Sequence, residues 1–251
     1  MGLGYDRRGS GEPLVLLHPL GADRHVWRPV LDLLAAERDV IAPDLPGFGE
    51  SAPLANGEPP SARELAAAVL ELVDEIGIER PHVAGCSLGG WVALQIALEG
   101  HARSVTAIAP AGLWARPLGP RPSVGRSLAR AASPLLPTLL AGDGARRLAL
   151  SNVMAHPDRV PRDEAVRLVR TYAAAEGYDD VNAAMRAGRF EGLERIRVPV
   201  TLAWPDQDRL VRRPAHLPPK VRNEVLRGCG HIPTWDDPQQ VARVLIRGSG
   251  G

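Results

Sequence analysis

Ser87 lies at the centre of the pentapeptide Gly85-Cys86-Ser87-Leu88-Gly89, between a β-like run at 81–84 and a helix-like run at 91–98. A serine hydroxyl is a poor nucleophile unless the backbone projects it from a sharp strand-to-helix turn toward a base. Glycines two residues to either side let such a turn close without Cβ clashes. The helix that follows directs free N–H groups at the place where an oxyanion develops. The spacing therefore predicts a serine nucleophile, and for the pentapeptide alone an ordinary glycine-rich turn is the alternative.

The elements that must position this turn alternate between strand and helix. Short apolar runs predict strands that are buried on both faces of a parallel sheet. Ser61 followed by Glu64 predicts a capping box at the start of a helix that runs to about residue 76. The other predicted strands and helices are, in chain order, 14–17, 26–34, 40–43, 82–85, 88–99, 105–109, 198–203, 224–226 and 241–246. This order predicts an α/β fold with a doubly wound, mostly parallel sheet.

The alternation breaks after Pro110. Residues 112–190 contain seven prolines and several helical fragments, without a convincing strand. We therefore predict a core domain formed by 1–111 and 191–251, with a helical lid, 112–190, inserted after the sixth strand. The lid would lie over the carboxyl edge of the sheet, which is where open α/β sheets bind ligands.

Composition excludes several classes of function. The chain has 251 residues, enough for one α/β domain, and a formal net charge of +1 without a block of like charges. Nothing in this balance indicates nucleic acid or an anionic membrane as a partner. The two cysteines have neither C-x-x-C nor Cys/His ligand spacing, so we expect no metal site and no disulfide framework.

Targeting and cofactor motifs are also missing from the sequence. No apolar run reaches the ~18 residues of a membrane span, and residues 1–10 lack a signal-peptide pattern. A cytoplasmic protein is therefore the default expectation. Neither G-x-G-x-x-G nor a P-loop is present, so no cofactor is expected. The sequence leaves the oligomeric state open.

Five segments together resemble the α/β-hydrolase family over nearly the whole chain. They occur in the order that is typical of this family, in which the nucleophile precedes the acid and the histidine comes last. The resemblance implies the α/β-hydrolase fold and serine-hydrolase chemistry. The segments are Leu16-Leu17-His18-Pro19-Leu20-Gly21, Asp44-Leu45-Pro46-Gly47-Phe48-Gly49-Glu50-Ser51, Gly85-Cys86-Ser87-Leu88-Gly89-Gly90, Trp204-Pro205-Asp206-Gln207-Asp208 and Gly228-Cys229-Gly230-His231-Ile232-Pro233.

The resemblance implies a catalytic triad of Ser87, Asp208 and His231. His231 would take the proton of the serine and later deliver it to the leaving group. Asp208 stands at the family's position for the acid, which would hold the correct tautomer of the imidazole. Asp206 lies two residues earlier and remains the alternative acid.

The resemblance also implies an oxyanion hole made by the backbone N–H groups of Leu20 and Leu88. The chain departs from the family at Pro19, where glycine is usual. Proline lacks an N–H and fixes φ, so we expect a stiffer loop whose donor at Leu20 is nevertheless retained. His18 and Asp44 are expected to have structural roles, with the Asp44 carboxylate capping local backbone.

Ser87 with a base and two oxyanion donors supports acyl transfer to water. We expect a carboxylesterase-like hydrolase whose partner is a small, mainly apolar ester substrate. Serine at position 87, where dehalogenases and epoxide hydrolases of this fold would have a carboxylate, argues against those two reactions. Hydrolysis of a C–C bond, a lactone or a thioester by the same triad is an alternative, as is a non-catalytic ligand-binding protein. Candidate substrate-binding residues in the lid, for which ordinary helix packing is the competing interpretation, are Trp114, Leu136, Leu140, Met154 and Tyr172.

Overall fold

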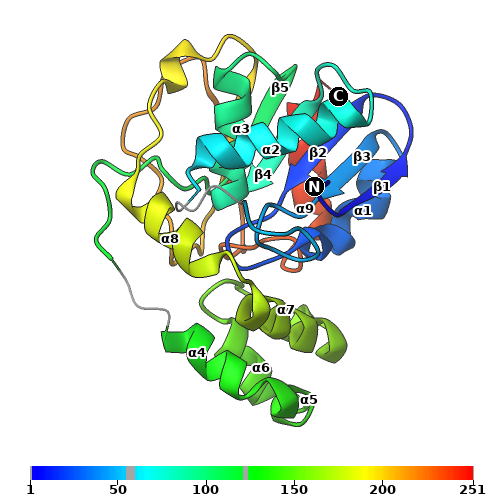
Figure 1. Ribbon diagram of the computed structural model, residues 1–251, viewed down its shortest axis with the longest axis vertical. Coiled ribbons are helices and arrows are strands. Elements are labelled where there is room, and N and C mark those ends of the chain that lie inside the picture. Colours follow the sequence, from blue (N-terminus) through cyan, green and yellow to red (C-terminus); the bar gives the residue numbers. More distant parts are fainter. Residues whose placement is uncertain (1, 55–59, 121–123, 251) are drawn as a thin grey trace.

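The computed structural model describes residues 2–54, 60–120 and 124–250. Within these residues, seven strands form one sheet in the order β1-β3-β2-β4-β5-β6-β7 (Figure 1). Neighbouring strands pair in parallel except β1, which pairs antiparallel with β3 at one edge. The predicted doubly wound, mostly parallel fold is therefore confirmed. The strands are β1 Tyr5–Gly9, β2 Pro13–Leu17, β3 Asp39–Pro43, β4 His82–Cys86, β5 Ser104–Ile108, β6 Val200–Pro205 and β7 Arg222–Leu226.

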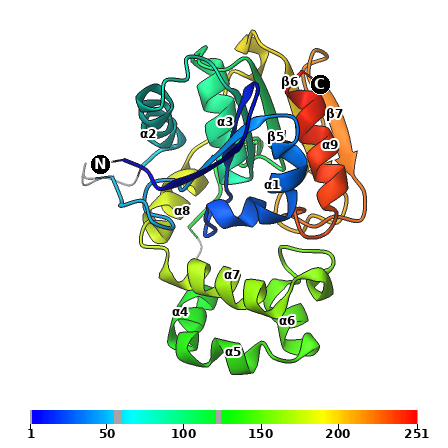
Figure 2. The ribbon, with the colours of Figure 1, turned by 90° about the vertical axis from the view of Figure 1, so that its right-hand side faces the viewer.

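Helices cover both faces of the sheet, as Figure 2 shows. Helices α2 (Ala62–Glu75) and α3 (Leu88–Leu98) pack together on one face, and α1 (Arg28–Ala35) and α9 (Pro238–Gly248) pack together on the other. Because successive side chains of a strand point to opposite faces, one short apolar strand supplies both layers. In β2, Val15 and Leu17 face the first layer, whereas Leu14 and Leu16 face the second.

Local signals explain where the elements begin. The predicted capping box is present at α2, because the Ser61 hydroxyl accepts from the Glu64 N–H and the Glu64 carboxylate accepts from the Ser61 N–H at 2.7 Å. The helix predicted at 26–34 begins instead as a 3₁₀ turn, η1 (Arg24–Trp27), before α1. Strand β1 was missed by the sequence analysis, since its polar residues lie at an exposed edge and carry no apolar run.

Five helices lie between β5 and β6 and, in the part of the chain that the structure describes, no strand accompanies them. They follow the fifth strand of the sheet, not a sixth as expected. We call residues 124–187 the helical segment. Its helices α4, α5, α6 and α7 form a layer apart from the sheet (Figures 1 and 2). The elements of this segment are α4 Val124–Ala131, η2 Ser133–Leu135, α5 Leu136–Leu139, α6 Asp143–Leu150, η3 Pro157–Arg159, α7 Arg162–Ala174 and α8 Tyr178–Ala187.

Helix α7 organises the helical segment, because α4, α5 and α6 each pack against it. A further 3₁₀ turn, η4 (Leu193–Arg195), leads back to the sheet. The division of the chain into a core of 1–111 and 191–251 and a lid of 112–190 stays a prediction. No helix among the described residues combines the length and the apolar character needed to cross a bilayer.

Candidate active site

Ser87 occupies a strained turn between β4 and α3. Its backbone has φ 54° and ψ −114°, a combination that a residue with a side chain rarely adopts. Three hydrogen bonds fix this geometry: the Ser87 N–H donates to the Ile108 carbonyl at 2.9 Å, and the Ser87 carbonyl accepts from Ala111 at 2.9 Å and Trp91 at 3.0 Å. The surrounding backbone therefore stabilises the strained conformation.

The two glycines of the pentapeptide are required by close backbone contacts. A Cβ on Gly85 would lie 2.2 Å from the Gly89 carbonyl oxygen, and a Cβ on Gly89 would lie 2.2 Å from the Leu17 carbonyl oxygen. Both distances are far below van der Waals contact, and backbone atoms cannot move aside as a flexible side chain can. The start of α3 thus lies directly on the end of β2, and the two glycines let the turn close without Cβ clashes, as expected from their spacing.

Two loops at the same edge of the sheet bring an acid and an imidazole together. The loop after β6 is joined to the loop after β7 by hydrogen bonds from the Asp206 N–H to the Leu226 carbonyl at 3.0 Å and from the Gln207 N–H to the Cys229 carbonyl at 2.9 Å. As a result the Nδ1 of His231 lies 2.7 Å from Oδ2 of Asp208. Both side chains are buried.

The structure distinguishes the two candidate acids by their partners. The other oxygen of Asp208 accepts from the N–H groups of Leu210 at 2.7 Å and Val211 at 3.0 Å, which orients the carboxylate. Asp206 instead accepts from the Gly228 N–H at 2.7 Å and so supports the loop that carries the histidine. Only Asp208 is hydrogen-bonded to the His231 ring in the described residues.

The imidazole loop lies against the Ser87 turn. The thiol of Cys86 donates to the backbone carbonyl of His231 at 3.3 Å. Cys86, which precedes Ser87, is therefore in contact with His231. In the described part of the chain, the Ser87 hydroxyl and the Nε2 of His231 have no hydrogen-bond partner, which leaves both available to a ligand. Burial raises the pKa of the Cys86 thiol, so this sulfur stays protonated and is a poor nucleophile.

The backbone N–H groups of the two residues expected to form an oxyanion hole are also unpaired. Neither Leu20 nor Leu88 donates its N–H to any acceptor among the described residues. The Leu20 loop is held by the buried His18 ring, whose Nδ1–H donates to the Pro19 carbonyl at 2.9 Å while its Nε2 accepts from the Leu45 N–H at 2.9 Å. Burial lowers the pKa of His18, which favours the neutral ring that these two bonds require.

Residues 14–244 match the profile of the alpha/beta hydrolase family. The chain belongs to this family. The alpha/beta hydrolase fold that the five segments indicated is thereby confirmed, and with it the expectation of a hydrolase.

The relatives of this alpha/beta hydrolase differ in the substrates that their names give. It is 34% identical over 200 residues to epoxide hydrolase EphH of Mycobacterium tuberculosis, an alignment that covers 74% of this chain and 93% of that protein. It is 27% identical over 267 residues to 2-hydroxy-6-oxononadienedioate/2-hydroxy-6-oxononatrienedioate hydrolase of Cupriavidus pinatubonensis, covering 96% of this chain and 88% of the relative. The enol-lactonase from Burkholderia xenovorans LB400 has the same fold, with a TM-score of 0.80 and 20% identity over 99% of this chain and 96% of the other.

The candidate substrate-binding residues of this alpha/beta hydrolase fall into two groups. Tyr172 and Met154 lie beside the site: a Cβ on Gly21, next to Leu20, would be 2.8 Å from the Tyr172 ring, and a Cβ on Gly230, next to His231, would be 2.8 Å from Met154 Cα. Trp114 packs edge-to-face on Trp91 of α3 with ring centroids 5.9 Å apart, and its indole N–H donates to the Gly188 carbonyl at 2.9 Å.

Leu136 and Leu140, like Trp114, belong to the second group, whose contacts are with other parts of the protein. Both are buried on α5, which packs against α7 within the helical segment. Their burial is explained by helix packing, and their contact with a substrate stays a prediction.

Asp23 was missed by the sequence analysis. This buried carboxylate follows the Leu20 loop and accepts from the Arg167 guanidinium at 2.8 Å and the Thr171 hydroxyl at 3.1 Å, both on α7. Burial alone would raise the pKa of Asp23, but its hydrogen bond with His25 and the charge of Arg167 outweigh burial and hold the pKa well below its ordinary value. No spacing signal relates these positions, which are 144 residues apart.

Asp236 is a second missed carboxylate, fully buried behind His231. It accepts from the N–H groups of Gly230 at 2.8 Å, Ala155 at 3.0 Å and His156 at 2.7 Å. It therefore joins the histidine loop to the residues that precede α7. Asp44, by contrast, was expected to cap local backbone and does so, because it accepts from the N–H groups of Arg24 at 2.7 Å and Glu50 at 2.9 Å.

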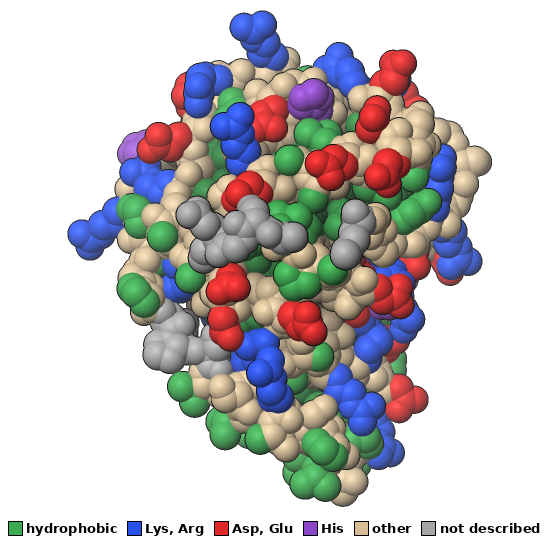
Figure 3. Space-filling view, in the orientation of Figure 1, with side chains coloured by type: hydrophobic (Ala, Val, Ile, Leu, Met, Phe, Trp, Pro, Cys, Tyr) green, Lys and Arg blue, Asp and Glu red, His purple; other side chains and the backbone are tan. Residues whose placement is uncertain are grey.

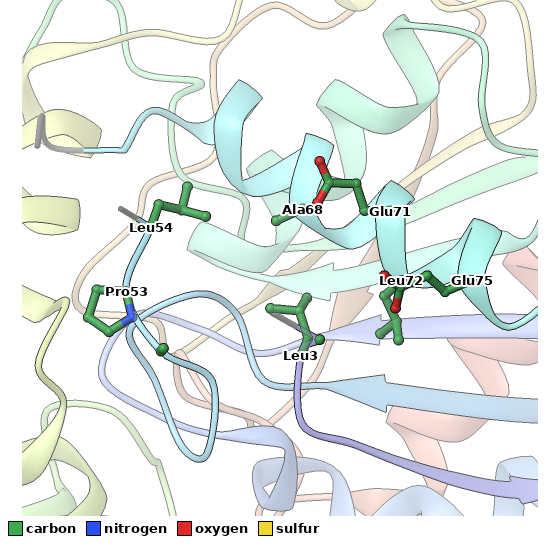
Figure 4. Close-up of a pocket in the computed structure, with 9 residues that line it drawn as sticks. Leu3, Pro53, Leu54, Ala68, Glu71, Leu72 and Glu75 are labelled. Atoms are coloured by element: carbon green, nitrogen blue, oxygen red, sulfur yellow. The ribbon is translucent and has the colours of Figure 1, made fainter. Parts of the chain in front are cut away.

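A surface pocket of about 220 Å³ lies elsewhere, between α2 and the chain near the N-terminus (Figure 4). Leu3, Pro53, Leu54 and Leu72 line it, with Glu71 and Glu75 at its side. None of the residues proposed for catalysis borders this pocket. Within the described ranges, no group of three or more His, Cys, Asp or Glu side chains is arranged to hold a metal ion.

Proposed function

We propose that this alpha/beta hydrolase is a serine hydrolase that cleaves a small, mainly apolar carboxylic ester. The observation that carries the proposal is the 2.7 Å hydrogen bond between Asp208 and His231, on a loop that contacts the residue next to Ser87. An imidazole whose Nδ1–H is donated to a carboxylate has Nε2 as its basic nitrogen. A general base is therefore available on a loop that contacts the residue next to the strained Ser87 turn.

In the proposed reaction the Ser87 hydroxyl attacks the ester carbonyl while Nε2 of His231 takes its proton. The carbonyl π electrons move to oxygen, and the N–H groups of Leu20 and Leu88 stabilise the resulting oxyanion. The intermediate then collapses, the C–O bond to the alcohol breaks, and the imidazolium returns its proton to the departing alkoxide. Water then attacks the acyl carbonyl while the same imidazole takes its proton. The bond between the acyl carbon and the serine oxygen breaks and the imidazolium returns the proton to that oxygen, which releases the carboxylic acid and the free serine.

The substrate class follows from the residues beside the site. Tyr172 lies beside the Leu20 loop and offers apolar surface to an acyl or alcohol group, and the buried Met154 lies beside the His231 loop. Together with Trp114, Leu136 and Leu140 they form the proposed substrate-binding set. Epoxide opening of the kind that uses a carboxylate nucleophile does not suit this chain, because residue 87 is serine and the Asp208 carboxylate is hydrogen-bonded to His231.

Hydrolysis of a lactone or of a C–C bond is the second candidate. The relatives named above include an enol-lactonase and a 2-hydroxy-6-oxononadienedioate hydrolase, and the same serine, imidazole and oxyanion donors would serve either bond. A substrate panel separates the candidates: short-chain p-nitrophenyl esters, a γ-lactone and a vinylogous 1,5-diketone. Our proposal predicts the highest kcat/KM for an ester.

The deciding experiment compares the wild-type protein with Ser87→Ala on p-nitrophenyl butyrate. We expect a loss of turnover of roughly 10³-fold or more, because the nucleophile is removed while the oxyanion donors remain. Ser127→Ala, an exposed serine on α4, is the matched control and should leave turnover unchanged. Equal rates for the wild type and Ser87→Ala would refute the proposal. Failure of a fluorophosphonate to label the wild type would instead indicate a non-catalytic ligand-binding protein.

A further inference from the structure

The outer helices of the helical segment carry a concentration of exposed apolar side chains. Val124, Leu128, Leu135, Leu139 and Leu148 are between 50% and 83% exposed. They come from α4, η2, α5 and α6. In Figure 3, hydrophobic side chains gather at the lower tip of the molecule, where Figure 1 shows these helices. Monomeric soluble proteins rarely expose an apolar patch of this kind unless it is a binding surface for a partner or a membrane.

The exposure is a property of one side of these helices. Around α5, Leu136 and Leu140 are each 4% exposed, whereas Leu135 and Leu139, offset by one residue, are 61% and 50% exposed. Residues four apart lie on the same face of a helix, so one leucine pair faces α7 and the other faces solvent. On α4, Val124 and Leu128 have the same four-residue spacing and are 63% and 66% exposed. The segment is therefore apolar on both sides.

The local charge of these outer helices differs from that of the whole chain. Residues 124–150 contain four arginines and one aspartate, a formal charge of +3, whereas the whole chain has +1 and the remainder therefore −2. Asp143, the one acid, is paired with Arg146, and the buried Arg126 is paired with Asp179 of α8, outside this range. Arg130 and Arg147 are exposed and have no acidic partner among the described residues. The net charge of the whole chain hides this local excess, and for that reason the sequence analysis did not indicate an anionic membrane as a partner.

We propose that this outer face, residues 124–150, docks on an anionic lipid surface. The exposed leucines would enter the boundary between headgroups and acyl chains, and the unpaired arginines would bind lipid phosphates. Each basic residue near an anionic bilayer adds to the attraction, and buried apolar area adds the remainder. Anionic lipid surfaces bind proteins that present an apolar face together with an excess of basic residues.

A second copy of the chain fits this face less well. Two such faces in contact would bring the exposed Arg130 and Arg147 of one copy near those of the other, and like charges in an interface are repulsive. An anionic bilayer satisfies both the apolar side chains and the arginines. The charge therefore decides between the two occupants.

The test measures binding of the full-length protein to sedimented vesicles in the absence of any ester substrate. We expect binding to phosphatidylcholine vesicles that contain phosphatidylglycerol, weaker binding in high salt, and little binding to phosphatidylcholine alone. Leu135→Ser/Leu148→Ser and, separately, Arg147→Glu should each lower the partition coefficient by about tenfold or more. These side chains are exposed, so circular dichroism should show both variants folded.

Matched controls lie outside this face. Val225 on β7 is 47% exposed, and Arg243 on α9 is also exposed. Neither Val225→Ser nor Arg243→Glu should change vesicle binding. The proposal is overturned if the wild type does not bind anionic vesicles, or if the variants of the face and the controls bind equally. It is also overturned if sedimentation without vesicles shows a dimer that Leu135→Ser/Leu148→Ser dissociates. Ester hydrolysis does not enter this assay, so its outcome is independent of the proposed function.

Discussion

The carboxyl edge of the sheet and the helical segment are held in place by different kinds of contact. At the edge, the turn of Ser87 and the loops of Asp208 and His231 are fixed mainly by backbone hydrogen bonds and by glycines on which other backbone lies directly. Backbone hydrogen bonds join the helical segment to the sheet domain from Gly177 to Gly47 at 2.9 Å and from Ile232 to Val153 at 2.7 Å. Other polar contacts are made by side chains, chief among them Asp23 with Arg167 and Thr171, and Arg28 with Glu164 at 2.7 Å. We therefore expect substitutions to cost more stability in the first region than in the second.

This difference has a consequence for specificity. Because backbone contacts set the geometry of the sheet edge, the sequence of the helical segment can change without altering that edge. This requires that a few polar contacts between the two regions, which we call joints, are retained. Asp23 and Asp236 form two such joints, one beside the Leu20 loop and one beside the His231 loop. Each joins a loop of the site to residues of the helical segment. The helices are thus positioned relative to the reacting groups by two buried carboxylates.

The largest effect is expected at the acid of the site. Asp208→Asn should lower kcat on p-nitrophenyl butyrate by about 10³-fold or more, because an amide favours the wrong imidazole tautomer and does not stabilise the imidazolium. Asp206→Asn is the matched control and should retain most activity, since its oxygen can still accept from Gly228. Steady-state kinetics of the two variants decide the question. A greater loss for Asp206→Asn would reverse the assignment of the acid.

The next effect concerns the backbone of the same edge. Gly89→Ala should reduce the free energy of unfolding by at least about 3 kcal/mol, because the new Cβ would lie 2.2 Å from the Leu17 carbonyl oxygen and 2.6 Å from that of His18. The shift that relieves the clash must move either α3 or the Leu20 loop, so activity should fall as well. Urea denaturation followed by circular dichroism measures the change. A loss below about 1 kcal/mol would show that this edge is softer than its contacts indicate.

These contacts also explain what could be predicted from sequence. Glycine at 85 and 89 is required by sterics, so the pentapeptide reports the turn directly. The apolar runs of β2 and β4 report strands buried on both faces, and the Ser61/Glu64 pair reports a helix start. Strand β1 escaped prediction because its pairing with β3 depends on backbone bonds that polar residues make equally well.

In the helical segment the deciding contacts are between side chains far apart in sequence. Nothing in the residues around Asp23 indicates that its partners stand at 167 and 171. Nor does the pattern of α5 reveal which leucine pair is buried, because both pairs have the same spacing. Only the position of α7 distinguishes Leu136 and Leu140 from Leu135 and Leu139. For this reason the sequence does not show which leucines of α5 face away from α7, and contact of the candidate residues with a substrate stays a prediction.

A smaller effect is expected at the joint beside the Leu20 loop. Asp23→Asn should reduce stability near neutral pH by about 1–2 kcal/mol, since an amide cannot accept from Arg167 and Thr171 as a carboxylate does. The folded-state pKa of Asp23 is depressed, so its stabilisation is fully present above the unfolded pKa of about 4 and is lost as the pH falls toward the folded value. The deficit of the variant should therefore shrink on acidification.

Urea denaturation of the wild type and Asp23→Asn at several pH values between about 3 and 7 tests this joint. Asp158→Asn, an exposed aspartate at η3, is the control and should follow the wild type at every pH. A difference between Asp23→Asn and the wild type that stays constant with pH would mean that the charge of Asp23 does not hold α7. Kinetics should show a fall in kcat, because Tyr172 of α7 touches the loop that carries the Leu20 donor.

The smallest effect, of opposite sign, is expected at Gly144 in α6. A Cβ there would meet nothing within 4 Å, so only the backbone preference of the helix changes. Gly144→Ala should raise stability by about 0.5–1 kcal/mol, because alanine loses less conformational entropy than glycine in a helix. The measurement is the same urea denaturation as for Gly89→Ala, with ester hydrolysis unchanged. One substitution type would then destabilise the region fixed by backbone and stabilise the region fixed by side chains. A loss of stability at Gly144 would show that the helical segment is as tightly constrained as the sheet edge.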